Sequence, residues 1–530
     1  MDPHEAAIDQ TPARTAVPKD WIPGLIQNAR YDLLSGFIIF LIALPLCLGI
    51  AIASGAPPIA GVISGFVAGM LASLLSGSYV TINGPAAGMI VIVLGAVTEL
   101  GFRGALAVGV VAGGIQIVLG LLRSGKMTAF FPLSVVHGML AGIGLIIMSG
   151  QIHIALGLNN PREHGFHILT AIPPSFANLV PIPALIGLIS VLIMIGWPMI
   201  KLGIAQVIPA PLVAVIVGTI IAALTGAGPL VKLPASFMEG FSSPDFSQIL
   251  SGAGIKWIVL YVFVASLESL LTSEAVDKLD PWKRRSNMNR ELMGKGAGNM
   301  ISSLIGGLPM IAEVVRSKAN ILQGARTRWS NFFHGFFLLA FVLLVPGVLQ
   351  MIPLAALAGV LLVIGFKLAH PNDFIHALHI GKVEFALMLI TAFTVLLTDL
   401  LIGVALGIVL GLIVAIVRGT SLGNLFKPDM EVVEEGDTIT VKFRRALGFN
   451  NFVGIRGKLD ALPRGKKVVL DFTGVQLIDP TAMERLYDFE REYRDAGGQL
   501  ERRGTEHLQA ESEHEFGTRR ELRRAEKKAM

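Results

Sequence analysis

An apolar run at residues 255–272 carries one carboxyl group, Glu268, and Thr272 follows it four residues later. In a helix this spacing places both side chains on one face. A charge at the bilayer centre costs about 2.5–3.5 kcal/mol on insertion scales, so its presence there indicates a function. A carboxylate and a hydroxyl could coordinate Na⁺ or carry a proton, which predicts a coupling-ion site. The alternative is a structural ion pair of Glu268 with Lys318 or Arg316.

A second polar cluster lies in the run PMIAEVVRSKAN, which contains Glu313 and Arg316. The planar guanidinium of Arg316 can bind an oxyanion through two parallel hydrogen bonds. Glu313 stands three residues earlier, within reach of Arg316 on a helix. It could take a second proton or cation, or it could neutralise Arg316, and the sequence leaves those two roles open.

The two halves of the apolar region repeat each other. FLIALPLCLG has Pro45 where VFVASLESLL has Glu268, and INGPAAGM around Pro85 corresponds to IGGLPMIAE around Pro309. The two separations agree, at 40 and 41 residues. A repeat of seven spans, an odd number, inserts its second copy upside down, which is the plan of secondary transporters.

Pro85 and Pro309 predict two helix starts inside the membrane, because proline lacks an N–H group and suits the first turn of a helix. Two such starts facing one cavity would present unpaired N–H groups and about +0.5 charge each. They would form an anion site without a permanent countercharge. Ordinary kinking by Pro and Gly is the alternative. The matched positions in two halves favour the anion site.

The elements that must position these residues are apolar runs long enough to cross about 30 Å of hydrocarbon. We predict about fourteen of them, at residues 33–53, 58–76, 84–98, 104–122, 132–152, 181–199, 209–225, 255–272, 295–306, 309–322, 332–348, 353–369, 383–397 and 399–418. Loops after even-numbered runs hold 13 Lys and Arg, including Lys295, and the others hold 4. This positive-inside pattern predicts an even number of crossings and both termini in the cytoplasm.

Charged side chains are concentrated near the C-terminus. Of 81 Lys, Arg, Asp and Glu residues, 39 lie in 429–530. The charged residues that remain before 429 are too few to cover the surface of a soluble fold. We therefore predict a polytopic membrane domain at 31–420, after a cytoplasmic segment at 1–30. A single cysteine, Cys47, excludes a disulfide framework and a Cys-rich metal site. No set of residues supports an enzyme, and the net charge of +5 does not indicate nucleic-acid binding.

The C-terminal region reads as a small α/β domain at 430–505. TITVKF (438–443) and KKVVLDF (466–472) have strand patterns, a helix is predicted from Thr481 to Arg494, and GGQLE begins another strand. Together they predict a βαβ-type unit. The charged residues 506–530 are predicted to be disordered.

Four stretches together resemble the SulP (sulfate permease) family of inorganic anion transporters with a C-terminal STAS domain: SLESLLTSEAVDKLDP, NRELMGKGAGNMISSLIGGLP, VVRSKANI and LDFTGVQLIDPTA. The resemblance runs from about residue 20 to 505. It implies fourteen helices in two inverted seven-helix repeats, at 31–226 and 254–420, divided into core and gate domains. It also implies a homodimer with an elevator-like motion and an anion held between the half-helices of spans three and ten.

The resemblance further assigns residues. Glu268 and Thr272 match the cation-site helix of bicarbonate-transporting relatives, which have Asp in place of Glu268. The anion-site positions that it implies are Pro85, Ala86, Ala87, Arg316 and Ser317.

Three departures from the family pattern bear on function. APPIAG replaces the aromatic Pro-x-Tyr-Gly-Leu-Tyr stretch, and Glu313 and Lys318 stand where many members have neutral residues. In anti-sigma-factor antagonists the STAS helix begins Asp-Ser, with the Ser phosphorylated. Here it begins Asp479-Pro480, so that switch is absent at this position.

The sequence as a whole predicts a secondary active transporter in a bacterial inner membrane. It would move sulfate or bicarbonate with Na⁺ or H⁺ as the coupling ion, without a cofactor, as a homodimer in the lipid bilayer. The STAS domain could dock a cytoplasmic protein. One alternative is a nucleobase permease for uracil or xanthine that uses Glu268 and Glu313. Arg316 and the STAS tail argue against this permease. The other is a membrane-anchored STAS signalling scaffold, which the cost of intramembrane charges disfavours.

Overall fold

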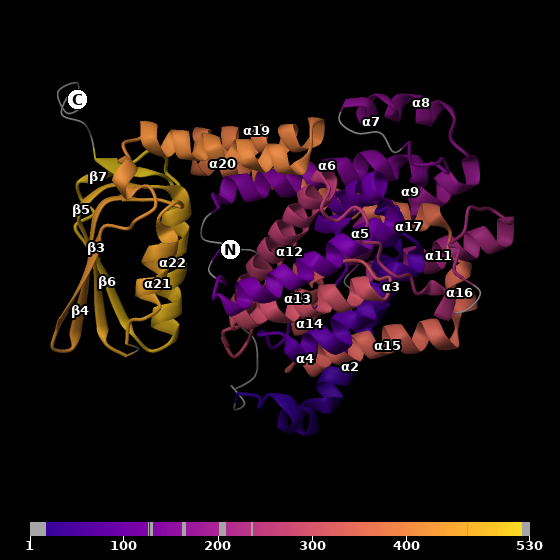
Figure 1. Ribbon diagram of the computed structural model, residues 1–530, viewed down its shortest axis with the longest axis horizontal. Helices are drawn as coiled ribbons and strands as arrows, with labels where there is room; N and C mark the ends of the chain where they lie inside the picture. The colour runs from indigo at the N-terminus through magenta and orange to yellow at the C-terminus, as the bar shows by residue number, and fades with distance from the viewer. Residues whose placement is uncertain are drawn as a thin grey trace. The chain divides into compact units, whose positions relative to one another are not determined.

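The computed structural model describes residues 17–125, 127, 131–161, 166–200, 208–234, 237–463 and 465–521. The chain divides into two compact units, one formed by residues up to 125 together with 144–367, and one formed by 126–143 together with residues from 368 onward. In the described part of the chain, 8 helices are long and apolar enough to cross a membrane, and two shorter apolar helices accompany them. Figure 1 shows the course of these helices.

The first unit is helical apart from two short strands. Its elements up to residue 125 are α2 (Trp21–Ala53), α3 (Pro58–Val67), η1 (Ala68–Ala72), α4 (Ser73–Leu75), β1 (Asn83–Gly84), η2 (Ala87–Met89) and α5 (Ile90–Leu121). Helix α6 (Leu133–Ala155) begins in the second unit and ends in the first. The next elements are α7 (Phe166–Thr170), α8 (Ile172–Ala177), α9 (Pro181–Gly196), η4 (Trp197–Met199), α11 (Ala210–Thr225) and η5 (Phe237–Gly240).

The second half of this unit contains α12 (Gly252–Leu279), α13 (Met288–Leu304), β2 (Ile311–Ala312), α14 (Val314–Leu322), α15 (Trp329–Leu344), α16 (Pro346–Gln350) and α17 (Leu354–Leu368). Helices α9 and α11 expose large apolar side chains along one side, as lipid-facing helices do, among them Leu185, Leu188, Leu192, Ile216 and Ile220. The buried core between α2, α3 and α15 includes Phe40, Leu48, Ile63 and Leu338.

The predicted apolar runs all fall on helices of the structure, with differences at their ends. Runs 84–98 and 104–122 belong to one element, α5, which is broken at Gly101, where φ is 73°. Glycine adopts this conformation without a steric penalty. Helix α14 has 9 residues, about 14 Å at 1.5 Å per residue, and so crosses only part of a bilayer. Helix α2 already begins at Trp21, so the predicted boundary at residue 30 lies inside a helix.

The second unit combines membrane helices with an α/β sheet. Its helices are α18 (Pro371–Ile380), α19 (Lys382–Leu397), α20 (Leu400–Val417), η6 (Leu422–Asn424), α21 (Phe452–Leu459) and α22 (Pro480–Asp495). Its strands are β3 (Met430–Glu435), β4 (Thr438–Leu447), β5 (Lys467–Ile478), β6 (Gln499–Arg503), β7 (Leu508–Ala510) and β8 (Arg519–Glu521).

The sheet has the strand order β3-β4-β5-β8-β7, and β6 pairs with β5. Strand β5 pairs in parallel with β4 and β6, while the other pairs are antiparallel. Helices α21 and α22 lie along one face of the sheet (Figure 1). The core between them includes Val441, Phe443, Phe472, Leu486 and Phe489. The strand predicted at 438–443 lies within β4, the strand predicted at 466–472 matches β5 from Lys467 onward, and the predicted helix lies within α22.

The structure differs from the predicted disorder of 506–530 over residues 506–521. Strands β7 and β8 pair with each other, and β8 also pairs with β5. Leu508 and Phe516 pack on the core of the sheet, and Arg520 pairs with Glu511 at 3.1 Å. Backbone pairing and two apolar anchors therefore order a segment whose composition is charged. Residues 522–530 lie outside the described part of the chain.

Candidate functional site

The two proline motifs from the two halves meet in the first unit. Strands β1 and β2 form a two-stranded antiparallel sheet, with Asn83 opposite Ala312 and Gly84 opposite Ile311. We call residues 76–84 the first arm and residues 308–312 the second arm. Extended backbone inside a membrane needs partners for its N–H and C=O groups, and the two arms supply them to each other.

The prolines do not begin the helices, contrary to the prediction. Pro85 follows β1, and the helical backbone starts at Ala87, with η2, while Pro309 precedes β2 and α14 starts at Val314. Both prolines thus lie in or beside the extended arms, where a missing N–H group is tolerated. The helix starts still lie next to the crossing, because each arm leads directly into one helix.

Arg316 lies in the first turn of α14 and is fully buried, at 0% exposure. Its Nη2 donates a hydrogen bond to the carbonyl oxygen of Pro85 and lies 3.2 Å from Glu313 Oε1. Its Nε and Nη1 have no partner among the described residues. A Cβ atom at Gly84 would lie 2.6 Å from Nη1, so only glycine leaves room there. Buried donors without acceptors are costly, which makes this guanidinium a candidate anion ligand.

The other two polar residues of this region are engaged within the protein. The Ser317 hydroxyl donates to the Glu313 carbonyl at 2.6 Å and accepts from the Ile82 N–H at 2.9 Å. Ser317 therefore ties the first arm to α14. Glu313 precedes α14 and pairs with Arg316, which favours the neutralising role over a separate cation site.

Glu268 lies on α12 with its carboxylate against the start of α5. A Cβ atom at Gly88 would lie 2.1 Å from Oε1 and 2.3 Å from Oε2. Oε1 has no hydrogen-bond partner, and no ion pair joins Glu268 to Lys318 or Arg316 in the described residues. Thr272 is buried one turn further along α12. The first turn of a helix has free N–H groups, so Glu268 faces the end at which Ala86 and Ala87 are also buried.

Sequence reasoning missed several buried polar side chains around the arms. Both amide atoms of Asn83 lack partners in the described structure, as do Asn331 Nδ2 and His334 Nε2. It also placed Lys295 in a basic loop, whereas Lys295 is buried inside α13, 2.5 Å from Glu291. The missed signal was the polar spacing within NRELMGKGAGN, which repeats every four residues.

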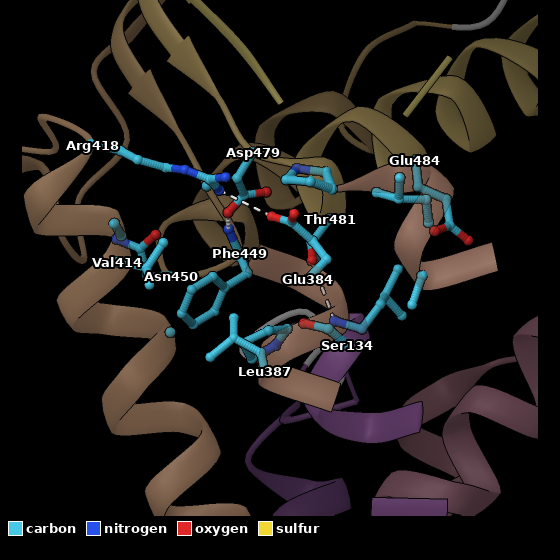
Figure 2. Close-up of a pocket in the computed structure, with 18 of the residues that line it drawn as sticks. Ser134, Glu384, Leu387, Val414, Arg418, Phe449, Asn450, Asp479, Thr481 and Glu484 are labelled. Carbon is cyan, nitrogen blue, oxygen red and sulfur yellow. Dashed lines mark hydrogen bonds and ion pairs between the residues drawn. The ribbon is translucent and has the colours of Figure 1, made fainter. Parts of the chain in front are cut away.

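The second unit contains a cavity of about 100 Å³ between α6, α18, α19, α20 and the start of α22 (Figure 2). Arg418 pairs there with Glu384 at 2.9 Å. The Asp479 carboxylate caps α22, accepting from the Ala482 and Phe449 N–H groups at 2.7 Å. Burial raises the pKa of Asp479 to about 6, against these two hydrogen bonds, and the nearby Glu384 contributes in the same direction.

The other residue of interest at this helix start is Thr481. Its hydroxyl is buried and accepts a hydrogen bond from the Leu133 N–H at 3.3 Å.

The described residues contain no group of three or more His, Cys, Asp or Glu side chains placed to hold a metal ion.

Long apolar helices, with two crossed arms that lead into buried helix starts, define a polytopic α-helical membrane transporter. The profile of the sulfate permease family matches residues 30–391, and the chain belongs to that family. This is a family of anion transporters, so the prediction that the protein is not an enzyme is confirmed.

Individual relatives agree with this assignment. The chain is 30% identical to the bicarbonate transporter BicA of Synechocystis sp., over 71% of this chain and 67% of the relative. It is 24% identical to the chloroplastic sulfate transporter 4.1 of Arabidopsis thaliana, over 91% of this chain and 78% of the relative.

Two solved structures have the same fold. The transmembrane domain of a cyanobacterium bicarbonate transporter BicA gives a TM-score of 0.62 at 27% identity, covering 72% of this chain and 97% of that one. The overall structure of SLC26A9 gives 0.66 at 16% identity, covering 91% and 85%, and shows the fold alone.

Proposed function

We propose that this protein is a secondary active transporter of a small inorganic oxyanion, sulfate or bicarbonate, coupled to Na⁺ or H⁺. The observation that carries the proposal is Arg316, a buried guanidinium with two uncommitted nitrogens beside the crossing of the arms. Buried donors without acceptors are costly, and an oxyanion bound by Arg316 would compensate for that cost. The relatives named as sulfate and bicarbonate transporters support the choice of anion.

The anion would lie between the start of α5, at Pro85, Ala86 and Ala87, and the start of α14. Arg316 would bind it through Nε and Nη1, and the free N–H groups of both first turns would add to the attraction. Glu313 balances the charge of Arg316 while no anion is bound. Ser317 keeps the first arm against α14 and thereby holds Arg316 in place.

Glu268 would couple the anion to a cation. Its carboxylate stands beside the α5 end of the proposed anion site, so an ionised Glu268 would repel the anion. A proton, or Na⁺ held by Glu268 and Thr272, would remove that repulsion and favour anion loading. The cation and the anion would then bind together and cross together.

The wider architecture is part of the same proposal. In this proposal the chain has fourteen spans in two inverted repeats and both termini in the cytoplasm of a bacterium. Two copies of the chain form a homodimer in the inner membrane. The sheet of the second unit would be a STAS domain that docks a cytoplasmic protein.

Uptake of labelled sulfate and bicarbonate into proteoliposomes of the purified protein tests the proposal. We expect one of the two anions to accumulate when a Na⁺ gradient or a pH gradient is imposed, and only slow equilibration without a gradient. Empty liposomes are the control. No uptake of either anion under any gradient would refute the function.

A nucleobase permease remains a second candidate, because Glu268 and Glu313 supply two acidic groups near the arms. The ion pair of Glu313 with Arg316 argues against it. Competition by uracil or xanthine, in place of competition by sulfate, would favour the permease.

A further inference from the structure

A polar stripe runs along one side of α13. Glu291, Lys295 and Asn299 follow at intervals of four residues, and Ser302 continues the same face. None of these side chains is more than 2% exposed. A buried polar face on a membrane helix requires partners along its whole length, and each of these four residues has at least one.

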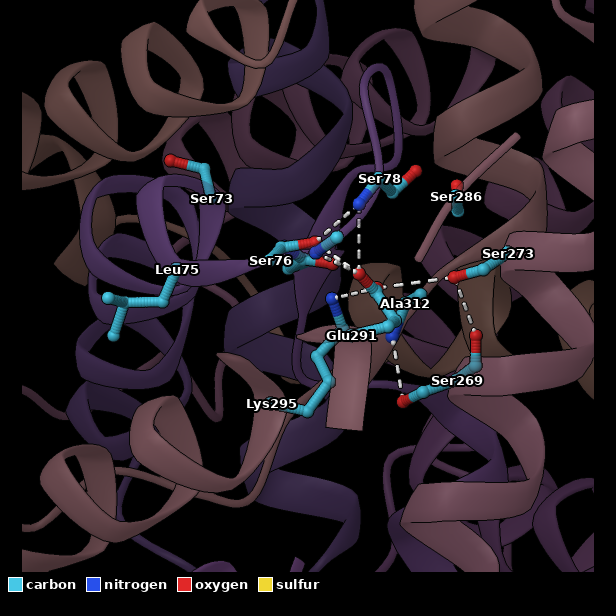
Figure 3. A network of polar contacts seen from close by, with 12 residues as sticks. Ser73, Leu75, Ser76, Ser78, Ser269, Ser273, Ser286, Glu291, Lys295 and Ala312 are labelled. Atoms are coloured by element: carbon cyan, nitrogen blue, oxygen red, sulfur yellow. Dashed lines mark hydrogen bonds and ion pairs between the residues drawn. The ribbon is translucent and has the colours of Figure 1, made fainter. Parts of the chain in front are cut away.

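Glu291 holds the beginning of the first arm. Its Oε2 accepts hydrogen bonds from the N–H groups of Gly77 at 3.0 Å and Ser78 at 3.2 Å, and from the Ser76 hydroxyl. Figure 3 shows this carboxylate at the centre of the network. Residues 76–78 form the bend between α4 and the extended chain that continues into β1, so the carboxylate determines where the first arm starts.

The same carboxylate is tied to α12. Oε1 of Glu291 receives the Lys295 ammonium at 2.5 Å, and it shares the proton of the Ser273 hydroxyl, 3.2 Å away, with the Ser269 carbonyl at 2.9 Å. One turn before Ser273, the Ser269 hydroxyl accepts from the Ala312 N–H of β2 at 3.3 Å (Figure 3). The helix that carries Glu268 therefore contacts both Glu291 and the second arm.

The far end of the stripe holds the second arm. The Asn299 side-chain oxygen accepts from the Met310 N–H at 2.6 Å, and the Ser302 hydroxyl donates to the Leu308 carbonyl at 2.8 Å. The Asn299 amide also donates to Gln116 of α5 at 2.7 Å. Helix α13 thus forms hydrogen bonds with both arms, and Glu291 and Ser302 at the two ends of the stripe lie 11 residues, or about 16 Å, apart.

We infer that the stripe of Glu291, Lys295, Asn299 and Ser302 positions the anion site by fixing the register of β1 against β2. Two-residue strands are too short to specify their own register, and a slip by one residue would move Gly84 away from Arg316. Lys295 supplies the countercharge that lets Glu291 stay ionised where water does not reach, and an ionised carboxylate makes the stronger hydrogen bonds. The inference rests on the proposed function for its transport readout.

A charge-neutral double variant separates positioning from stability. In Glu291→Gln with Lys295→Met no buried charge is left unpaired, so the protein should fold and unfold near the wild-type temperature. The amide oxygen of glutamine is a weaker acceptor than the ionised Oε2 that receives all three hydrogen bonds from residues 76–78, and the amide nitrogen cannot accept the bond that Oε1 accepts from Ser273. We therefore expect the anion KM to rise about tenfold while the maximal uptake rate stays within twofold. A purely structural ion pair would leave both kinetic parameters unchanged.

A matched pair of single variants on the same helix tests the second arm. Ser302→Ala removes the hydroxyl bonded to Leu308 and should raise KM about threefold. Ser303→Ala removes an equally buried hydroxyl without a partner in the described residues and should leave KM unchanged. This pair decides the question even if the double variant does not fold.

Hydrogen exchange provides a readout that does not depend on transport. Amides of the two arms, at 76–84 and 308–312, should exchange faster in the double variant than in the wild type, while α15 exchanges at an unchanged rate. If the arms of the double variant exchange faster but the wild-type protein takes up neither anion, the positioning role stands and the proposed function is refuted. Wild-type KM together with unchanged exchange in the double and Ser302→Ala variants would overturn the positioning role.

Discussion

Two ion pairs in the first unit each contain a fully buried cation, Lys295 within α13 and Arg316 at the start of α14, and differ in how completely their hydrogen bonds are satisfied. In the pair of Glu291 and Lys295, the carboxylate receives two backbone N–H groups, two serine hydroxyls and the ammonium. In the pair of Glu313 and Arg316, two of the three guanidinium nitrogens have no partner among the described residues. Both cations are 0% exposed.

The difference separates support from binding. A saturated buried pair costs desolvation that its own hydrogen bonds offset, so it can only hold the structure together. An unsaturated pair retains donors whose desolvation is compensated only when a ligand arrives. Hydrogen-bond saturation, rather than charge or depth, therefore distinguishes the supporting role inferred for Glu291 and Lys295 from the anion-binding role proposed for Arg316.

The largest expected effect that tests this comparison is on stability. Lys295→Met leaves Glu291 buried without its countercharge and should destabilise the protein by about 3–5 kcal/mol, as breaking one side of a buried pair does. Thermal unfolding in detergent measures it. The double variant with Glu291→Gln should recover most of the loss, and an undiminished unfolding temperature in Lys295→Met alone would contradict the supporting role.

Arg316→Ala should act on binding instead. We expect a loss of about 2–3 kcal/mol in anion affinity, a 30- to 150-fold rise in KM, with a smaller loss of thermal stability than in Lys295→Met. Arg316→Lys keeps the positive charge but lacks the planar guanidinium, so its KM should lie between those of the wild type and the alanine variant. Uptake kinetics in proteoliposomes provide the measurement, and an unchanged KM in the alanine variant would remove Arg316 from the site.

Glu268→Gln sharpens the comparison by removing a carboxylate that has no ion-pair partner in the described chain. We expect gradient-driven accumulation to fall at least tenfold, about 1.4 kcal/mol, while the protein still folds. Glu268→Asp, which keeps the charge, is the matched control and should retain coupled uptake. Accumulation at the wild-type level in the glutamine variant would exclude Glu268 as the coupling residue.

The last expected effect is a pH dependence of stability, and it concerns Asp479 in the second unit. Its folded pKa of about 6 lies above the ordinary value of 3.8, so the folded state binds more protons between those pH values. The corresponding stabilisation is fully present below about pH 4 and is lost as the pH rises through 6.

Asp479→Asn keeps a good helix cap and removes this titration. It should flatten the change in stability between pH 4 and 7, which we place on the order of 1–2 kcal/mol for this partly exposed group. Limited proteolysis of the full-length protein during thermal unfolding at each pH reports it. A pH dependence identical to that of the wild type would rule out Asp479 as its source.

Sequence reasoning singled out the motifs around Pro85 and Pro309 because they are local and matched in separation, but it predicted helix starts there and no paired strands. It misplaced the helix starts by two to five residues, since proline suits a first turn and an extended arm equally well. The choice between them depends on the β1–β2 pairing, which is a contact between residues more than 200 positions apart.

Two other errors have the same origin. Lys295 was counted with the basic loops because charge alone does not reveal a buried partner, and Glu291 four residues earlier was the missing clue. Residues 506–521 were expected to be disordered from their composition, yet strand pairing with β5 and the packing of Leu508 and Phe516 order them. Local patterns predicted the elements, while partners distant in the chain determined the details.

The hydrogen-bonded crossing of the arms limits how the proposed substrate compartment can open. Pulling its two walls apart would break the β1–β2 pairing and the contacts of α13 with both arms, each exposing backbone groups that cost several kcal/mol in lipid. For the proposed transport, this cost favours walls and cargo that travel as one block. We therefore expect access to alternate through the movement of that block past the surrounding helices, with its interior geometry preserved from one side of the membrane to the other.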